Sequence, residues 1–290
     1  MLDPRPSRPL ALAAMAIFLG GAHPAAASEE ELVLAFIPQE NPEKLLLDVE
    51  VITDYLAEEL DMPVSGFVTS DHAAAVEALR NGDADISFMG ALPFVIAREA
   101  IGAEPLLAEV YRGKPTYTAR IFVRRDSGIE ELADLEGRSI AFADPISESG
   151  YLYPLHLFYD AGLIEADAEP SSFFSEVYFA GGYQQAMQAV ANGLVDAAGS
   201  SQYAELLLTP EQQAEIASIA ESEPIPSHTV IARPGLPEEV REDFVAAMLA
   251  LNEPDKRHLL AHVYSPDGYQ RAEPGTFDGV AQLARTHGLL

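Results

Sequence analysis

The stretch Asp144-Pro145-Ile146-Ser147-Glu148-Ser149-Gly150-Tyr151 decides how the rest of this chain is interpreted. It follows an apolar, strand-like run at residues 139–143 and precedes a helix-like run at residues 151–158. The first N–H groups of a helix have no partner inside the helix, and the helix dipole places partial positive charge there. A strand, a turn containing serine and glycine, and a helix start therefore predict a binding site for an anion.

Three residues of this stretch strengthen the prediction of an anion site. Ser147 and Ser149 would add hydroxyl donors, and Gly150 lets the backbone approach a ligand closely. Serine and aspartate are also ordinary N-cap residues of helices, so local structure alone explains the same letters. Both interpretations stay open at this point.

The composition limits the kinds of protein that this chain can be. Its 290 residues carry a formal net charge of −29 and include no cysteine. An excess of carboxylates argues against nucleic acid or an anionic membrane as a partner. Without cysteine there are no disulfides, thiolate metal sites or cysteine nucleophiles, and no lipid anchor on an N-terminal cysteine.

The N-terminal segment, residues 1–27, is typical of a secretory signal peptide. Arg5 and Arg8 form its basic start, and residues 10–22 form an apolar core that is too short to span a membrane. Ala25-Ala26-Ala27 offers a cleavage site. We therefore expect the chain to be exported and to lie free in a periplasm.

Beyond this segment, apolar strand-like runs alternate with helix-like runs. Residues 32–37, 64–68 and 84–89 are strand-like, and helical spacing or helix-start residues separate them. This alternation predicts an α/β chain with parallel or mixed sheets flanked by helices.

A weak internal repeat relates residues 72–85 to residues 183–196. Each unit is a short helix, an Asn-Gly stop and a strand. Such matches also arise by chance among alanine-rich helices, but we interpret them as equivalent positions in two similar lobes. The matched pairs are Ala75/Ala186, Ala78/Ala189, Asn81/Asn192, Gly82/Gly193 and Asp85/Asp196.

The repeat predicts the limits of two lobes. We expect residues 28–118 and 226–290 to form the first lobe and residues 119–225 the second. Two crossover strands near residues 115–122 and 224–232 would act as hinges.

Open α/β sheets bind ligands beyond the carboxyl ends of their strands, so the cleft is expected between the two lobes. His72, Tyr183 and the Ser147–Tyr151 segment would all begin helices that point into it. We expect residues 116–123 to be one long β-rich segment and residues 236–290 to be helical.

At this point the sequence resembles a known family, the phosphonate/phosphite/phosphate periplasmic solute-binding proteins of ABC transporters. The most specific likeness is Asp144-Pro145 followed by Ser147, Ser149 and Gly150, where the family carries Ser-Thr-Ser before the glycine. The likeness covers nearly all of the chain after the N-terminal segment. The other similar segments are residues 37–44, 54–56, 115–117, 124–129, 134–137, 224–226 and 236–239.

The resemblance implies a two-lobe periplasmic-binding-protein fold, type II-like, that closes about a hinge on a small phosphorus oxyanion. It also implies an ABC permease and its ATPase as partners, a monomer, no cofactor and no metal. The serine-rich turn would hold the oxyanion, and residues from both lobes would discriminate its substituent.

The chain departs from the family pattern at several positions. The family's threonine in the serine motif corresponds to Glu148, and an aromatic residue at the first-lobe helix start corresponds to His72. An aromatic or polar contact corresponds to Met89. A histidine in the second lobe corresponds to Gly182, beside Tyr183.

The candidate ligand-binding residues come from the serine motif, the crossover strand and the strand and helix ends of both lobes. They are Ser147, Glu148, Ser149, Gly150, Tyr151, His72, Met89, Tyr117, Gly182, Tyr183 and Ser200.

Glu148 leaves the identity of the ligand open, because a carboxylate beside a bound dianion is repulsive. In the first interpretation, Glu148 points to solvent while its neighbours bind the anion. In the second, Glu148 is protonated or pairs with an amino group of a zwitterionic ligand. The third interpretation is that the specificity has moved to another solute.

The remaining histidines are expected to be structural. His156 lies in an apolar helical run and is interpreted as a core residue, and His228 as a loop residue in the second crossover. His258 and His262 have a metal-like spacing, but a surface helix explains them better.

No G-x-S-x-G, H-E-x-x-H or P-loop motif is present, so we expect a binding protein and no enzyme. A sensor subunit for a membrane kinase is the alternative to transport.

Overall fold

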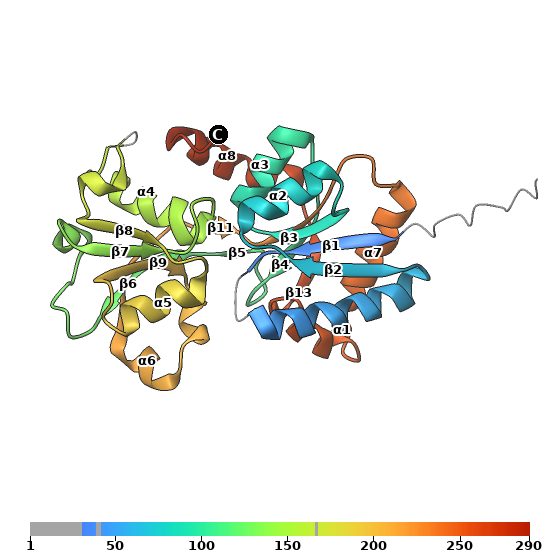
Figure 1. Ribbon diagram of the computed structural model, residues 1–290, viewed down its shortest axis with the longest axis horizontal. Coiled ribbons are helices and arrows are strands. Elements are labelled where there is room, and N and C mark those ends of the chain that lie inside the picture. The colour runs from blue at the N-terminus through green and yellow to red at the C-terminus, as the bar shows by residue number, and fades with distance from the viewer. Residues whose placement is uncertain (1–30, 39–41, 166–167) are drawn as a thin grey trace, which may run out of the picture.

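Two separate sheets form the frame of the computed structural model, which describes residues 31–38, 42–165 and 168–290. The sheets lie side by side, each with helices on its faces, and the chain passes between them in the middle of the molecule (Figure 1). The segment expected to be a signal peptide, residues 1–27, lies outside the described residues.

The first lobe contains a six-stranded sheet in the order β13-β4-β12-β3-β1-β2. β1, β2 and β3 are parallel, and β12 joins β3 in antiparallel orientation. Its strands are β1 (Leu32–Phe36), β2 (Val64–Val68), β3 (Ile86–Met89), β4 (Glu104–Val110), β12 (Thr229–Ala232) and β13 (Gly268–Arg271). Its helices are α1 (Pro42–Leu60), α2 (His72–Asn81), α3 (Ala91–Ile101), α7 (Glu238–Ala250) and α8 (Asp278–Thr286).

The second lobe contains a five-stranded sheet in the order β10-β6-β9-β7-β8. β7, β8 and β9 are parallel, and β6 is antiparallel to β9. Its strands are β6 (Ala119–Arg124), β7 (Ser139–Phe142), β8 (Glu176–Phe179), β9 (Ala197–Ser201) and β10 (Ile216–Glu221). Its helices are α4 (Tyr153–Asp160), α5 (Tyr183–Ala191) and α6 (Pro210–Glu215).

The two sheets repeat one another, as the internal repeat predicted. The order β2-β1-β3-β12-β4 in the first lobe corresponds to β8-β7-β9-β6-β10 in the second. Asp85 accepts a hydrogen bond from the Val33 backbone N–H at 2.9 Å, and Asp196 accepts one from the Ser139 N–H at 2.9 Å. The matched aspartates thus join the same pair of strands in each lobe, and the equivalence is confirmed.

Local sequence signals explain the limits of α2. The Asp71 carboxylate accepts a hydrogen bond from the Ala74 N–H at 2.7 Å and so caps the first turn. Gly82 ends the helix with φ 76°, a left-handed conformation that glycine adopts without steric cost.

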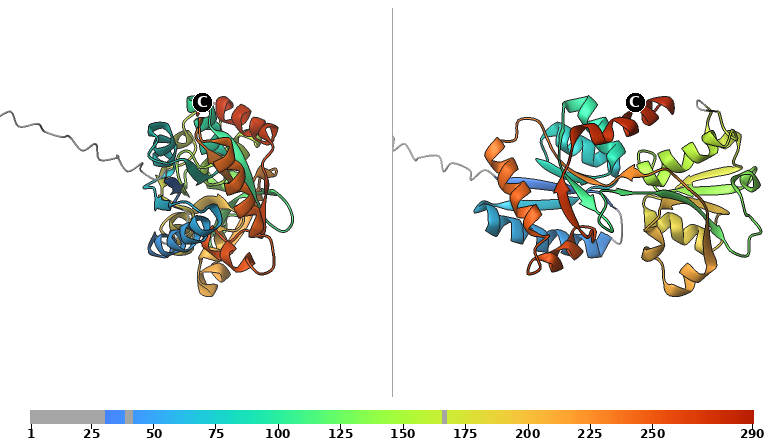
Figure 2. Two further views of the ribbon diagram at one scale, coloured as in Figure 1. Left: turned by 90° about the vertical axis from the view of Figure 1, so that its right-hand side faces the viewer. Right: turned by 180° about the vertical axis from the view of Figure 1, so that it is seen from behind.

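A two-stranded sheet, β5 (Thr116–Tyr117) paired with β11 (Ile225–Pro226), links the two lobes. The right-hand view of Figure 2 shows the chain passing from lobe to lobe at this position. Residues 116–123 are β-rich, as expected, but Thr118 separates β5 from β6 and the two strands belong to different sheets.

The expectation that residues 236–290 are wholly helical was also wrong. β13 lies between the helices of this segment and extends the first sheet by pairing with β4. No helix among the described residues is long and apolar enough to cross a membrane.

Candidate ligand site

The serine turn, defined here as residues 147–150, does not begin an ordinary α-helix. Residues Glu148–Leu152 form one π-helical turn, with the Leu152 N–H bonded to the Ser147 carbonyl at 3.0 Å, and α4 follows. Pro154 has no N–H to offer the Gly150 carbonyl, which instead accepts a bond from the Ala143 N–H at 3.0 Å. The helix-like run predicted from Tyr151 therefore becomes an α-helix only at Tyr153, after a π-helical turn whose N-cap is Ser147.

Both serine hydroxyls of the turn are buried and already bonded within the protein. Ser147 Oγ accepts a hydrogen bond from the Gly150 N–H at 3.0 Å and lies 3.2 Å from the Tyr183 hydroxyl. Ser149 Oγ lies 2.9 Å from the same Tyr183 hydroxyl and 3.1 Å from that of Tyr117. The predicted donors are brought together, but two tyrosines cover them.

Glu148 lies at the centre of this group and is fully buried, with 0% of its surface exposed. The Tyr117 hydroxyl donates to its Oε1 at 2.7 Å, and His228 Nε2 lies 3.2 Å from the same oxygen. Of the three interpretations of Glu148, the one in which it points to solvent is therefore wrong. The expectation that His228 is a plain loop residue was wrong as well, because the histidine is buried against this carboxylate.

The other carboxylate oxygen of Glu148 reaches the first lobe. Oε2 lies 3.5 Å from the Leu92 N–H in the first turn of α3. A methyl group added at Gly90, the N-cap of α3, would lie 2.1 Å from that oxygen. The carboxylate thus occupies the N-terminus of a helix in the opposite lobe, where unpaired N–H groups and the helix dipole favour negative charge.

The charges of this pair follow from their contacts. Burial alone would raise the pKa of Glu148, but the hydrogen bond and charge of His228 and the Tyr117 hydroxyl lower it to about 2. Burial likewise opposes protonation of His228, and its bond to Glu148 outweighs this effect and raises its pKa. Glu148 is therefore an anion near neutral pH, and its carboxylate favours the protonated form of His228.

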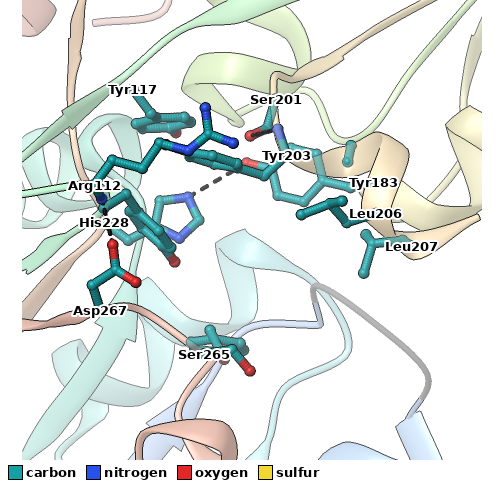
Figure 3. A pocket seen from close by; sticks show the side chains of 13 residues that line it. Arg112, Tyr117, Tyr183, Ser201, Tyr203, Leu206, Leu207, His228, Ser265 and Asp267 are labelled. Carbon is teal, nitrogen blue, oxygen red and sulfur yellow. Dashed lines mark hydrogen bonds between the residues drawn. The ribbon is translucent and has the colours of Figure 1, made fainter.

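A cavity of about 440 Å³ lies beside the serine turn, and we call it the tyrosine cavity (Figure 3). Its walls come from both lobes and from the linking strands, and five of the lining residues are tyrosines. Tyr117, Tyr183 and His228 line it and also contact Glu148 or the serines, so they separate the cavity from the turn. The remaining lining residues are Tyr111, Arg112, Ser201, Tyr203, Ala204, Leu206, Leu207, Tyr264, Ser265 and Asp267.

Charged and aromatic groups define the outer wall of the tyrosine cavity. The Arg112 N–H donates to the Asp267 carboxylate, and the Arg112 guanidinium lies 5.7 Å from the centre of the Tyr203 ring. The Tyr111 and Tyr203 rings lie 5.0 Å apart. None of these four residues was predicted from the sequence, because each lies on a turn or strand end that carries no local motif.

Several predicted residues do not line the cavity. Met89 packs in the core of the first lobe, and Tyr151 packs its ring 5.1 Å from those of Phe142 and Phe179. Gly182 is the N-cap of α5, and Ser200 is buried in β9 while its neighbour Ser201 faces the cavity.

His72 begins α2 as predicted, but its side chain is buried and does not line the tyrosine cavity. Burial lowers the pKa of His72, against the opposing charges of Asp144 and Glu148. Its Nδ1 is one of the few buried side-chain atoms in the described ranges that lack a hydrogen-bond partner.

The other histidines lie away from the site. His156 is half-buried on α4, not in the core as expected, and its Nδ1 lies 3.1 Å from Nε2 of His287 beyond α8. His262 pairs with Asp48 at 2.7 Å, and His258 contacts the Asp255 carbonyl. No group of three or more metal-ligating side chains was found in the part of the chain that the structure describes.

Comparison with known proteins places this arrangement in a family. A model described as "ABC transporter, phosphonate, periplasmic substrate-binding protein" matches residues 34–277. The chain belongs to this family. The family is one of transport components, in agreement with the expectation of a binding protein and no enzyme.

A curated relative is the phosphate-import protein PhnD of Mycolicibacterium smegmatis, 32% identical over 174 residues. That alignment covers 58% of this chain and 54% of the relative, so the match spans about half of the relative's length.

Two solved structures share the two-lobe fold. PhnD1 from Prochlorococcus marinus, in complex with methylphosphonate, has a TM-score of 0.80 at 17% identity and covers 90% of this chain and 99% of its own. A binding protein component of an ABC phosphonate transporter from Pseudomonas aeruginosa has a TM-score of 0.80 at 21% identity, with coverages of 90% and 87%.

Proposed function

We propose that this protein is the solute-binding component of an ABC importer and captures a small phosphorus oxyanion, a phosphonate, phosphite or phosphate, by hinge closure. The observation that carries the proposal is the tyrosine cavity, which takes its walls from both lobes and adjoins the serine turn. Family membership and the phosphate-import relative support the choice of ligand class.

The linking strands explain how closure would act on the ligand. Tyr117 lies on β5, where the chain crosses between lobes, and its hydroxyl contacts both Glu148 and Ser149. His228 follows the second linking strand, β11, and contacts the same oxygen of Glu148. Rotation about these strands would therefore move the residues that contact the serine turn, and closure would exclude water from the ligand.

The same proposal includes the setting of the protein. The mature chain would be exported by residues 1–27 to the periplasm, act as a monomer, and dock on a permease driven by an ATPase when loaded. We keep residues 28–118 with 226–290 and residues 119–225 as the two lobes. Strand membership supports these limits, because the second sheet begins at Ala119 and ends at Glu221.

A thermal-shift screen of the mature protein tests the ligand class. The panel holds phosphate, phosphite, methylphosphonate, aminoethylphosphonate, sulfate and several amino-containing solutes without phosphorus. A ligand at 100 times its Kd stabilises the folded state by about 2.7 kcal/mol, which raises the melting temperature. We expect shifts with the phosphorus oxyanions; a panel in which none of them shifts the protein would contradict the proposal.

A double substitution tests the serine turn. Ser147→Ala with Ser149→Ala should weaken oxyanion binding strongly, and the matched control is Ser70→Ala with Ser218→Ala at exposed positions. Because Ser147 is also an N-cap, the unfolding transition of each variant is recorded first. Unchanged affinity in a folded double variant would remove the serine turn from the site.

One observation favours a second candidate function, the capture of a zwitterionic solute. The Glu148 carboxylate is charged and would attract an ammonium group, whereas it repels a dianion. Shifts with amino-containing solutes and none with phosphate or methylphosphonate would favour this candidate.

A further inference from the structure

We propose that the carboxylate of Glu148 is an internal occupant of the oxyanion site, which holds the ligand-free lobes together and which the ligand must displace. The inference rests on the proposed function and adds a mechanism to it. Glu148 would then set the affinity of this chain for oxyanions by competing with them from within the molecule.

The contacts of the carboxylate are those that an anionic ligand would use. Its donors come from the linking strands, through Tyr117 at 2.7 Å and His228 at 3.2 Å, and from the first lobe, through the Leu92 N–H at 3.5 Å. Glu148 itself belongs to the second lobe. One side chain thus bridges both lobes and the hinge, as a bound oxyanion would in a closed receptor.

The backbone of the first lobe is shaped to admit this carboxylate. Gly90 has φ −76°, a conformation open to any residue, so its lack of a side chain is not explained by the backbone. A Cβ at this position would meet both carboxylate oxygens of Glu148, at 2.1 and 2.4 Å. The three heavy atoms nearest to such a Cβ all belong to the Glu148 carboxylate group.

The surroundings of Glu148 offer more polar groups than a carboxylate uses. Among the described residues, His72 Nδ1, Ser200 Oγ and Ser227 Oγ are buried without a hydrogen-bond partner. His72 is close enough to interact electrostatically with Glu148, Ser227 precedes His228, and Ser200 lies on β9, which packs against the turn that carries Glu148. A phosphonate has three oxygens where a carboxylate has two, and it would satisfy groups that the internal occupant leaves unpaired.

Internal occupancy has a defined thermodynamic consequence. When the binding-competent state is only a fraction of the population, the apparent Kd rises by the inverse of that fraction. Removing the competing carboxylate should therefore tighten oxyanion binding. It should also open the ligand-free protein, because the bridge between the lobes is lost.

The test combines calorimetry with small-angle X-ray scattering on the mature protein and uses methylphosphonate as the probe. Glu148→Thr places the residue of the resembled family motif at this position and should bind the probe at least tenfold more tightly than the unmodified protein. The matched control is Glu109→Gln, which neutralises the other carboxylate beside His228 and should leave the affinity within about twofold. Equal or weaker binding by a folded Glu148→Thr variant would overturn the proposal.

A second variant tests occupancy without changing any charge. Gly90→Ala should evict the carboxylate by steric overlap, and both it and Glu148→Thr should raise the radius of gyration of the ligand-free protein. An unchanged radius in both variants would overturn the internal bridge. If the unmodified protein and Glu148→Thr both fail to bind any phosphorus oxyanion, the proposed function fails and the internal occupancy with it, whereas binding that Glu148→Thr does not tighten overturns the internal occupancy alone.

Discussion

His228 lies between two buried glutamates whose environments act in opposite directions. Glu148 contacts its Nε2 at 3.2 Å, and Glu109 on β4 lies 3.8 Å from its Nδ1. The pKa of Glu148 is lowered to about 2, whereas burial raises the pKa of Glu109 because His228 and the Tyr111 hydroxyl compensate only in part. Equal burial thus leads to opposite shifts, and close, well-directed donors make the difference.

The comparison indicates which carboxylate can serve the site. Glu148 keeps its charge because it receives donors from the hinge and the first lobe, so its effect depends on how the lobes are placed. Glu109 receives its hydrogen bond from Tyr111, only two residues further along the chain, at 2.8 Å. Lobe movement would break the first set of contacts and leave the second intact.

The largest effect is expected from removing the residue that both carboxylates share. His228→Ala leaves the charge of Glu148 buried without a cation, a change that costs about 3–5 kcal/mol of unfolding free energy. Urea unfolding at pH 6 measures it. The matched control, His262→Ala, removes a partly exposed histidine from its pair with Asp48 and should cost below about 1 kcal/mol. A similar loss of unfolding free energy in both variants would mean that the buried Glu148–His228 pair stabilises the protein no more than the partly exposed pair does.

A smaller loss is expected when only the hydroxyl beside Glu148 is removed. Tyr117→Phe deletes the 2.7 Å hydrogen bond to a charged acceptor and keeps the ring, so we expect a loss of about 1.5–3 kcal/mol. Tyr111→Phe is the counterpart on the Glu109 side and should cost less, because its acceptor has a raised pKa. Urea unfolding of the two variants measures both losses of unfolding free energy. A greater loss for Tyr111→Phe than for Tyr117→Phe would contradict the expected order.

The pH dependence of stability separates the two carboxylates further. The raised pKa of His228 means that its contribution is complete below the ordinary value of 6.5 and is lost as the pH rises through the raised value. The lowered pKa of Glu148 means that its contribution is present above 4.5 and is lost as the pH falls toward about 2. The pair should therefore stabilise the protein most between pH 4.5 and 6.5.

The alkaline decline can be assigned by substitution. The titratable groups that face or influence His228 include Glu148, Glu109, Tyr117, Tyr183 and His72. Glu148→Gln removes the partner that raises its pKa, so the decline in unfolding free energy above pH 6.5 should flatten. If the unfolding free energy of that variant declines above pH 6.5 by the same amount, the decline belongs to another titratable group.

The fold was predictable because its signals are local. Strand runs, helix caps and each unit of the repeat are short, contiguous segments. The two units end in Asp85 and Asp196, and each aspartate accepts a hydrogen bond from a backbone N–H of the equivalent strand in its lobe. β13 was missed because its four residues, half of them exposed, carry no apolar pattern. Strand propensity also cannot tell that β5 and β6 belong to different sheets.

The site was predictable only in part, because its geometry depends on contacts between distant segments. The serines were predicted from a motif, Tyr183 from a helix start, and Tyr117 from its place on the crossover strand. The burial of Glu148 and the role of His228 follow from lobe packing, which no local pattern encodes. The tyrosines of the outer cavity wall, Tyr111 and Tyr203, were not predicted for the same reason: they lie on a strand end and a turn, and only lobe packing brings them to the cavity.

The smallest effect is expected at the second carboxylate, and it sharpens the comparison most. Glu109→Gln keeps an acceptor for the Tyr111 hydroxyl and removes a charge that burial already disfavours, so the unfolding free energy at pH 7 should change by less than about 1 kcal/mol. Glu148→Gln, made in the same background, should cost more, because it removes an ionised partner of His228. Equal losses in the two variants at pH 7 would contradict the expected difference between the two sides of His228.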